Sequence, residues 1–526
     1  MRRGSAFAVA LALAWGCGAL TVGGNAFAVQ IPFGPGDSFT KLEAAKAGDE
    51  VVIAHGTYAF RVHLTQLGTA QKPIVIRAAD PKNKPVWDLS ATLVENAPGS
   101  STAGDRGRGC WQVDGGTGYV IESIVLTGCR NADKTSAGLR YYNGADVILR
   151  DAYVHDNDNG ITGGTQSSNA LVEWSEIAHN GDTTATLPTH NIYVFGGVFG
   201  LRYSYVHDSL QGQNFHIRAQ NGLIESNWFA RAKSYEGDLM TSDEAAPGTS
   251  LQSLVIRGNV FLQAAQPDNT SQVFAVFNDT SVAGVAFSVR VLHNTFIGSG
   301  KNSAFLHLSN ADHTQMQAEV SNNILTGTNR AALVADNQAG ILVGAANWLA
   351  TGADPGPLVD TVFGATPGFK NAVANDFTLL ATSAAVGKAS GIPKALPSTE
   401  YYKDEVTARR YRVRASVRDL GAFESTTTDP SYGPYDPPPV PDAGPPLPNT
   451  DSGIPIPDPG GTSGGVHGDD AGPVHDAGGS SATPGASSSG CGCTTTRGDG
   501  SAAFGTALLV LGTAFVRRRL GTPRRR

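Results

Sequence analysis

Several features are scarce in this sequence of 526 residues, and each scarcity excludes a class of protein. Five cysteines are too few for a disulfide-stabilised scaffold of this length. Charged residues make up only 16%, and the formal net charge of −7 gives no reason to expect nucleic-acid binding. Apolar residues at helical spacing are hard to find between residues 51 and 350, where Val, Ile, Phe, Thr and Asn are plentiful. The sequence therefore favours a fold built from strands.

A short cassette recurs in this strand-rich region. The six positions of the cassette are, in order, apolar, charged, any residue, small or Asn, any residue, and apolar. Its copies lie at residues 149–154, 172–177, 201–206, 224–229 and 256–261. They begin 23 (149 to 172), 29 (172 to 201), 23 (201 to 224) and 32 (224 to 256) residues apart. A unit of this length cannot bury its own apolar face, so neighbouring units must stack. Because a solenoid grows by adding coils, one long domain is expected.

Three columns of the aligned cassettes describe the stack. The second column alternates in charge, through Glu122, Arg150, Glu173, Arg202, Glu225 and Arg257. In parallel strands these side chains lie about 4.8 Å apart, where opposite charges attract. The fourth column becomes Asn, which tolerates a left-handed bend and can bond the Asn of the next unit, at Asn227, Asn259, Asn294 and Asn323. The sixth column holds Phe229, Phe261 and Phe296. We predict an all-β parallel β-helix; an antiparallel sandwich, the alternative, requires none of these columns.

The N-terminal residues predict export. Arg2 and Arg3 precede an apolar run at residues 6–15, and residues 26–28 form an A-x-A cleavage site, so residues 1–28 read as a signal peptide. A lipoprotein signal at Cys17 is the alternative. In an oxidising compartment Cys110 and Cys129 can pair, or they can remain two buried thiols.

The C-terminal residues change in composition. Pro, Gly, Asp and Ser dominate residues 426–490, which predicts a disordered linker. Cys491 and Cys493 follow, then an apolar stretch at residues 502–516 and a cluster of Arg. The apolar stretch is short for a membrane span, which needs about 17–25 residues, and the Arg cluster favours a cytoplasmic C-terminus.

Residues 491–526 closely resemble the C-terminal sorting signals of myxobacterial surface proteins, the MYXO-CTERM type. The Cys pair, the apolar helix and the Arg cluster occur in the same order. The resemblance implies processing near Cys491 and Cys493 by a sorting protease, contact with the membrane, and display at the cell surface (outer membrane) or release outside the cell. An ordinary tail anchor and a chance apolar segment are the alternatives.

The body of the chain also resembles a family. Residues 48–58 and 72–78 resemble the opening coil of secreted right-handed β-helix proteins, among them alginate lyases and chondroitinase B, and residues 376–379 and 419–424 resemble the close of many such domains. The resemblance implies a right-handed parallel β-helix of the pectate-lyase type over residues 29–425. We expect a monomer. This architecture hosts lyases, hydrolases, epimerases, adhesins and binding surfaces, so the resemblance leaves the chemistry open.

Polar side chains gather on one predicted strand of three adjacent coils. Alternation along these strands turns five side chains outward: Asn191, Tyr193, Asn214, His216 and Arg218. The next coil adds Glu236 and Asp238, with Arg231 and Lys233 on the loop before it. A face of this kind suits a long repetitive ligand such as a polysaccharide.

Residues 212–227 resemble a recurrent pattern of secreted β-helix proteins. The matching residues are Asn214, Arg218, Ala219, Ile224, Glu225 and Asn227. His216 stands where the pattern usually has Lys, which puts a lysine-base mechanism in doubt. Residues 234–239 resemble the acidic segment that follows in the same proteins.

A uronate lyase is one chemistry that these residues allow. It must neutralise the substrate carboxylate and remove the proton on the adjacent carbon. Arg218 is the candidate for neutralisation, and His216, Lys233 and Tyr193 are candidates for the base. Glu236 and Asp238 are candidate ligands for Ca²⁺, a cation that prefers oxygen.

Two alternatives stand beside the lyase. A hydrolase would use two carboxylates from among Glu236, Asp238 and Asp243. In the structural alternative the same residues form a solvated outer face, with His216 and Arg218 paired to Glu236 or Asp238.

Two further groups have open interpretations. His155-Asp156 and His207-Asp208 fall at the same place in their cassettes, and His179 falls in register with Asp156 and Asp208. These residues either bind a transition metal or cap the turns. Trp174 and Tyr203 share a column, where they either form an aromatic platform for a sugar or cover the turn. The sequence as a whole predicts a surface-displayed protein that acts on polysaccharide, most simply a lyase, with a non-catalytic glycan- or matrix-binding protein as the alternative.

Overall fold

The computed structural model describes most of the chain up to residue 436. The described residues are 29–91, 108–164, 168–240, 251–265, 272–278, 286–299, 304–310, 316–327, 331–336, 342–390, 396–402, 409–415, 418–426 and 430–436. They belong to one compact unit, Met1–Pro457, and the second unit, Asp458–Arg526, lies outside them. The predicted signal peptide, most of the linker, Cys491 and Cys493 also lie outside the described residues. Within the described residues no helix is both long and apolar enough to cross a membrane.

Three long sheets make up the described part of the chain, and all their strand pairs are parallel. Sheet A contains β1 (Gln30–Phe33), β2 (Glu50–Ile53), β5 (Ile74–Ala78), β8 (Tyr119–Glu122), β11 (Asp146–Arg150), β14 (Asn169–Glu173), β17 (Val198–Arg202), β20 (Asn221–Glu225), β23 (Leu251–Arg257), β26 (Ala286–Leu292), β29 (Met316–Ser321) and β32 (Leu342–Val343). Sheet B contains β3 (Thr57–Tyr58), β6 (Val86–Asp88), β9 (Val125–Thr127), β12 (Tyr153–His155), β15 (Glu176–Ala178), β18 (Tyr205–His207), β21 (Trp228–Ala230), β24 (Val260–Leu262), β27 (Thr295–Ile297), β30 (Ile324–Thr326), β33 (Trp348–Ala350) and β34 (Val362–Gly364). Sheet C contains β4 (Val62–Leu64), β7 (Gly109–Asp114), β10 (Ala137–Tyr142), β13 (Asn159–Gly163), β16 (Ile192–Phe195), β19 (Phe215–Arg218), β22 (Gly237–Met240), β25 (Phe274–Asn278), β28 (Ala304–Asn310) and β31 (Ala331–Asp336).

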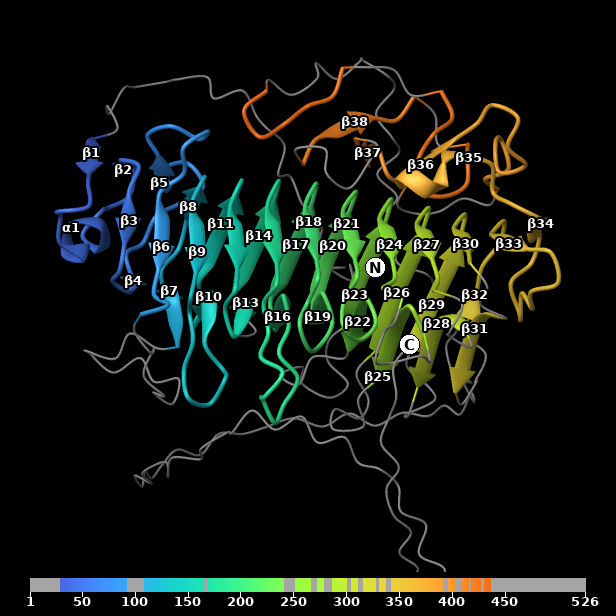
Figure 1. Ribbon diagram of the computed structural model, residues 1–526, viewed down its shortest axis with the longest axis horizontal. Coiled ribbons are helices and arrows are strands. Elements are labelled where there is room, and N and C mark those ends of the chain that lie inside the picture. The colour runs from blue at the N-terminus through green and yellow to red at the C-terminus, as the bar shows by residue number, and fades with distance from the viewer. Residues whose placement is uncertain are drawn as a thin grey trace, which may run out of the picture. The chain divides into compact units, whose positions relative to one another are not determined.

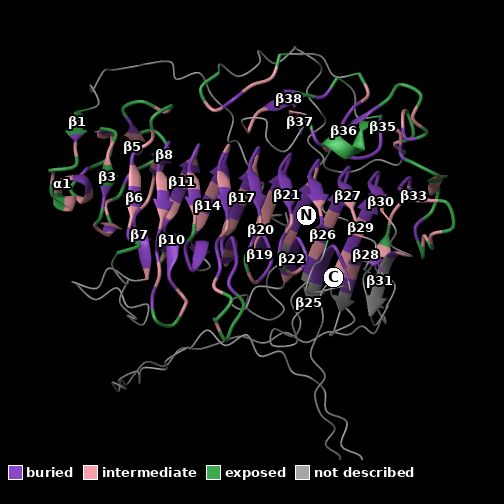
Figure 2. Cartoon of the chain, viewed as in Figure 1, coloured by how far each residue is buried: buried purple, intermediate pink, exposed green. Residues whose placement is uncertain are grey.

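A complete coil contributes one strand to each sheet, whereas the coils at the two ends are incomplete, and the coils stack along the long axis of the unit (Figure 1). For example, β14, β15 and β16 form one coil, and β17, β18 and β19 form the next. The predicted parallel β-helix is therefore confirmed. The short helix α1 (Phe39–Glu43) lies at the first coils. The strands are mostly buried, whereas exposed residues gather at the turns and at the two ends (Figure 2).

The alternating charge column exists as predicted. The register places Glu122, Arg150, Glu173, Arg202, Glu225 and Arg257 in consecutive strands of sheet A. Arg150 contacts Glu122 at 2.6 Å and Glu173 at 2.7 Å, and Arg202 contacts the other oxygen of Glu173 at 2.7 Å. Glu173 is fully buried, and these two guanidinium groups offset the cost of burying its charge.

The predicted asparagine column is confirmed and is longer than predicted. It lies in the turn between sheets A and B, and we name it the A–B ladder. Each side-chain amide donates to the next Asn Oδ1, in the order Asn227, Asn259, Asn294, Asn323 and Asn347, over 2.9–3.1 Å. The predicted phenylalanine stack lies beside it, with ring centroids 5.0 Å apart for Phe229 and Phe261 and 4.6 Å apart for Phe261 and Phe296.

The chain returns over the same turn after the last coil. We name the described residues from 369 to 436 the C-terminal strap; it contains β35 (Phe369–Asn371), η1 (Ala372–Ala374), β36 (Asp376–Leu379), β37 (Thr399–Tyr401) and β38 (Tyr411–Val413) (Figure 1). Phe377 of the strap stacks on Trp228, with ring centroids 5.4 Å apart. Tyr435 donates to Asp151 Oδ2 at 3.0 Å. The folded unit therefore extends past the boundary predicted at residue 425, to at least residue 436.

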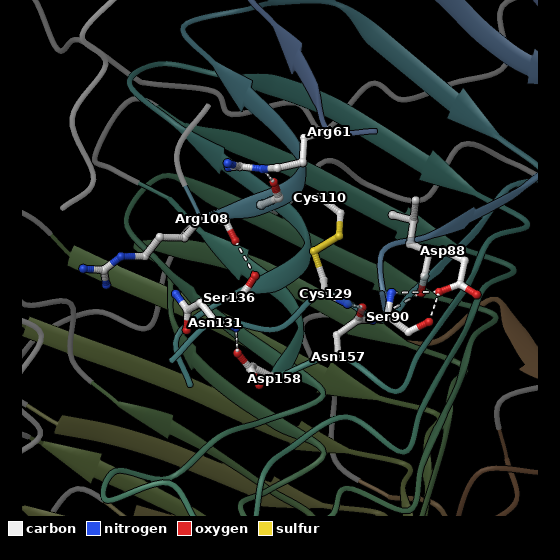
Figure 3. Close-up of a disulfide and its surroundings, with 12 residues drawn as sticks. Arg61, Asp88, Ser90, Arg108, Cys110, Cys129, Asn131, Ser136, Asn157 and Asp158 are labelled. Carbon is white, nitrogen blue, oxygen red and sulfur yellow. Dashed lines mark hydrogen bonds between the residues drawn. A yellow bond between two sulfur atoms is a disulfide. The ribbon is translucent and has the colours of Figure 1, made fainter. Parts of the chain in front are cut away.

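The two cysteines within the described residues form a disulfide. Cys110 is the second residue of β7, Cys129 follows β9, and their Cα atoms lie 5.8 Å apart (Figure 3). Both are fully buried, and the backbone N–H of Cys129 donates to Asn157 Oδ1 at 2.8 Å. Of the two alternatives that the sequence left open, the structure contains the disulfide.

Candidate functional site

The outward face of sheet C brings several of the predicted site residues together. Tyr193 of β16, His216 of β19 and Asp238 of β22 occupy one register position in three consecutive coils. Their strand neighbours Ile192, Phe215 and Leu239 are fully buried in the core. We name the group on this face the His216 cluster; it consists of His190, Tyr193, Gln213, His216, Arg218, Tyr235 and Asp238.

Asp238 anchors the cluster. Its Oδ1 lies 2.8 Å from Nδ1 of His216, and its Oδ2 accepts a hydrogen bond from the Tyr235 hydroxyl at 2.7 Å. Burial alone would raise the pKa of Asp238, but the adjacent His216 imidazole and the hydrogen bond from Tyr235 lower it below its usual value. Asp238 is therefore a carboxylate at neutral pH and fixes the orientation of the imidazole.

Arg218 lies on the other side of the same imidazole. Its Nε donates to Nε2 of His216 at 3.2 Å. Because a guanidinium only donates, Nε2 is the accepting nitrogen and the His216 proton is on Nδ1, facing Asp238. An Asp–His pair with an arginine at the lone pair of Nε2 can remove a proton close to a bound carboxylate.

His190 and Tyr235 belong to the cluster although the sequence did not single them out. The His190 ring lies 5.3 Å from that of His216, and burial, followed by the proximity of the His216 imidazole, lowers the pKa of His190 to about 3. It is therefore neutral, and its Nδ1 accepts from the backbone N–H of Gln213 at 3.3 Å. Both residues precede their strands by two positions (His190 before β16, Tyr235 before β22), outside the alternation that selected the others.

The prediction that Asn191 and Asn214 face outward is wrong. Both are fully buried in the turn between sheets B and C, in a second column that we name the B–C ladder. Each side-chain amide donates to the next in the order Asn157, Asn180, Asn191 and Asn214, and the last amide donates to Glu236 Oε2, over 2.8–2.9 Å. Asn191 and Asn214 come immediately before the first residues of β16 and β19, so the alternation within those strands does not apply to them.

Glu236 ends the B–C ladder and does not share a site with Asp238. Its Oε2 accepts from Asn214 at 2.8 Å and its Oε1 from the backbone N–H of Ala232 at 3.2 Å. Burial raises its pKa to about 8, so it is mostly a neutral acid at pH 7. A neutral interior acid does not fit a calcium site shared with Asp238. Of the three predicted hydrolase carboxylates, Glu236 is thus inside the ladder, and Asp243 lies outside the described residues.

Four other predicted residues are placed away from the His216 cluster. Tyr203 stacks on Tyr411 of the strap, with centroids 4.3 Å apart, and Trp174 lies 5.3 Å from Tyr203, so this pair covers the turn and is not an open platform. Arg231 donates to Asp208 at 3.0 and 2.9 Å, beside sheet B. Lys233 is exposed in the turn between β21 and β22.

Comparison with known proteins yields structural similarity only. No protein-family model matches the chain, and no curated protein matches it. Among solved structures, the pectate lyase Pel9A is 14% identical, with a TM-score of 0.44 over 76% of this chain and 97% of that one. An alginate lyase from Paenibacillus sp. str. FPU-7 is 16% identical, with a TM-score of 0.34 over 64% and 98%. The PL6 family polysaccharide lyase Pedsa3628 from Pseudopedobacter saltans is 11% identical, with a TM-score of 0.37 over 75% and 99%. At these identities the similarity concerns the architecture.

Proposed function

We propose that this protein is a lyase that cleaves a uronate-containing polysaccharide on the outward face of sheet C. The observation that carries the proposal is the line of Asp238, His216 and Arg218. Asp238 Oδ1 lies 2.8 Å from one ring nitrogen of His216, and the Arg218 guanidinium donates to the other at 3.2 Å. A base and a group that neutralises a carboxylate thus lie side by side, as the elimination requires.

In the proposed reaction Arg218 leaves His216 and pairs with the carboxylate of the substrate. His216 Nε2 then removes the proton from the carbon beside that carboxylate, while Asp238 holds the proton on Nδ1. The electron pair forms a carbon–carbon double bond as the bond to the glycosidic oxygen breaks. Tyr193, whose ring lies 4.8 Å from that of His216, gives its proton to the leaving oxygen. The proton on His216 returns to Tyr193 through solvent, which restores the enzyme.

The test is an assay of the purified protein on alginate, pectate, chondroitin and heparin-like polymers. Rising ultraviolet absorbance reports the unsaturated ends that only an elimination produces. His216→Ala is expected to reduce the rate by about 10²–10⁴-fold, the range for a general base. His307→Ala is the matched control, because His307 of β28 occupies the same register column three coils further along. Unchanged activity of both His216→Ala and Arg218→Ala would reject this site.

A non-catalytic glycan-binding protein is the second candidate, and one observation favours it. His216 and Arg218 are only 7% and 6% exposed and contact each other, as in a structural network. In that case the polymers are bound without cleavage, and Arg218→Ala weakens binding. Retained binding with no unsaturated product across the whole panel would select this function over the lyase.

We further propose that the protein is exported and displayed at the cell surface. The order of the sequence supports this: an export signal at residues 1–28, a linker, Cys491 and Cys493, an apolar stretch and an Arg cluster. Replacing both cysteines by Ser is expected to remove the protein from the surface, measured by antibody labelling of intact cells. Undiminished labelling would reject the sorting function of the tail.

A further inference from the structure

We propose that His179, His207 and Asp208 form a binding site for a divalent transition-metal ion at the edge of sheet B. One ligand atom of each residue lies within 4.8 Å of the others. In the part of the chain that the structure describes, no other His, Cys, Asp or Glu side chains converge in this way. The site is separate from the His216 cluster, which lies on sheet C, and its function does not depend on the proposed lyase activity.

The stacking of the coils fixes the positions of these residues. Ala178 of β15 pairs in register with His207 of β18, so His179 stands one coil from Asp208. His179 and Asp208 are both in the left-handed region of the backbone, with φ of 53° and 51°. Parallel pairing therefore sets the backbone at both ligand positions before any ion arrives.

His207 and Asp208 are close enough for one ion to bind both after a small separation. Nδ1 of His207 lies 2.6 Å from Oδ2 of Asp208, which is a hydrogen-bond distance. A transition metal holds nitrogen and oxygen ligands at about 2.0–2.2 Å, so two ligands in a tetrahedral site lie about 3.3–3.5 Å apart, and the two atoms must separate by about 0.8 Å to admit the ion. The ion takes the place of the proton between the two atoms. His179, which is partly exposed and whose ring is 5.5 Å from that of His207, supplies the third ligand by rotation of its side chain.

The surrounding groups support such an ion. Nε2 of His207 lies 3.3 Å from Oε1 of Glu176, the kind of carboxylate contact that orients metal-bound histidines. Arg409 of the strap holds the other oxygen of Glu176 at 2.6 Å. Arg231 donates to Oδ1 of Asp208 at 3.0 Å and to Oδ2 at 2.9 Å, so the ion must compete with the guanidinium for Oδ2. Two imidazoles and one carboxylate select zinc, cobalt or nickel over calcium or magnesium.

The experiment measures binding of Zn²⁺ to the full chain by calorimetry, and of Co²⁺ by its visible absorption. His179→Ala is expected to weaken Zn²⁺ binding at this site by at least about tenfold, the scale for losing even an outer-shell partner. His155→Ala is the matched control. The sequence Tyr-Val-His-Asp occurs at residues 153–156 as well as 205–208, and His155 Nδ1 lies 2.6 Å from Asp156 Oδ2, but His155 is not in the cluster.

The control separates this site from other ligands in the chain, such as the thiols of Cys491 and Cys493, because neither histidine substitution changes them. Zn²⁺ should raise the melting temperature of the wild type and of His155→Ala but not that of His179→Ala. If His179→Ala lowers the melting temperature in the absence of metal, His179→Phe is used instead, because phenylalanine keeps an aromatic ring in place but cannot coordinate the ion. Equal Zn²⁺ affinity of the wild type and both His179 variants, equal losses in His155→Ala and His179→Ala, or no binding to the wild type would overturn the proposal.

Discussion

The two ladders of this solenoid are built from the same side chain but end differently. The A–B ladder consists of asparagine from Asn227 to Asn347, and every rung both donates and accepts. The B–C ladder begins with asparagine and ends at Glu236, in the coil that carries Asp238. An amide can repeat without limit because it is complementary to itself, whereas a carboxyl group stops the repeat and titrates. The comparison shows how a purely structural column can acquire a pH dependence where it meets the candidate site.

Breaking a middle rung is the strongest test of whether the ladders are equivalent. Asn259→Ala removes the acceptor of both the side-chain amide and the backbone N–H of Asn227, and it leaves Asn294 Oδ1 with only the backbone N–H of residue 259 as a donor. We expect a loss of about 4 kcal/mol in the free energy of unfolding. Asn191→Ala removes the corresponding rung of the B–C ladder and should cost a similar amount. Denaturant titration followed by circular dichroism measures both. A cost below about 1 kcal/mol for one of the two would show that the ladders are not equivalent.

Glu236 at the end of the B–C ladder predicts a pH dependence of stability that the all-asparagine A–B ladder lacks. Burial raises the pKa of Glu236 from 4.5 to about 8, so the folded state binds this proton more tightly than the unfolded state. The stabilisation is complete below about pH 4.5, declines as the pH rises, and is lost above about pH 8. Its size is about 5 kcal/mol or less.

Glu236→Gln is the matched variant for this effect, because it keeps the acceptor for Asn214 and removes the titration. The stability of the wild type relative to Glu236→Gln should therefore fall between pH 4.5 and 8. Unfolding midpoints at a series of pH values provide the measurement. Parallel curves for the two proteins would mean that the Glu236 carboxyl does not retain its proton in the folded state.

Of these three features, a single ion pair of the charge column is expected to contribute least to the free energy of unfolding. Arg257, whose side chain is only partly exposed, contacts the buried Glu225 at 2.9 Å, and Arg257→Ala should cost about 2 kcal/mol in the free energy of unfolding, with a smaller effect at high salt. Unfolding at low and high salt measures this contribution. A cost as large as that of Asn259→Ala would reverse the order of importance between the charges and the amides.

The difference between the ladders also explains which one could be predicted. Asn227, Asn259, Asn294 and Asn323 keep one offset within the cassette, so aligning the repeats found them. Asn180 lies two residues after β15, whereas Asn191 lies one residue before β16, and residues 181–190 of the same coil separate the two. The position of the asparagine relative to the strands therefore changes along the B–C ladder, so an alignment of repeats at a fixed position cannot find it.

The candidate site was predicted in part for the same reason. His216, Arg218 and Asp238 lie within strands, where alternation assigns faces correctly. Asn191, Asn214 and Glu236 lie one residue outside strands, where it does not. The covering of Trp174 and Tyr203 by Tyr411 depends on a contact across more than 200 residues, which no local pattern contains.

The C-terminal strap has a consequence for the order of folding. Its contact between Tyr435 and Asp151 spans 284 residues, and that between Tyr435 and Ser123 spans 312. Paired residues of neighbouring coils are only 14 (348 to 362) to 49 (62 to 111) residues apart in the sequence, so stacking closes short loops. Docking of the strap closes long loops, at a greater entropic cost. We expect the strap to dock last, when the coils beneath it already exist. Protection of the Tyr411 and Tyr432 amides from hydrogen exchange would then appear later than protection of the sheet A amides. The strap would thus add its contacts only to a solenoid whose coils have already stacked.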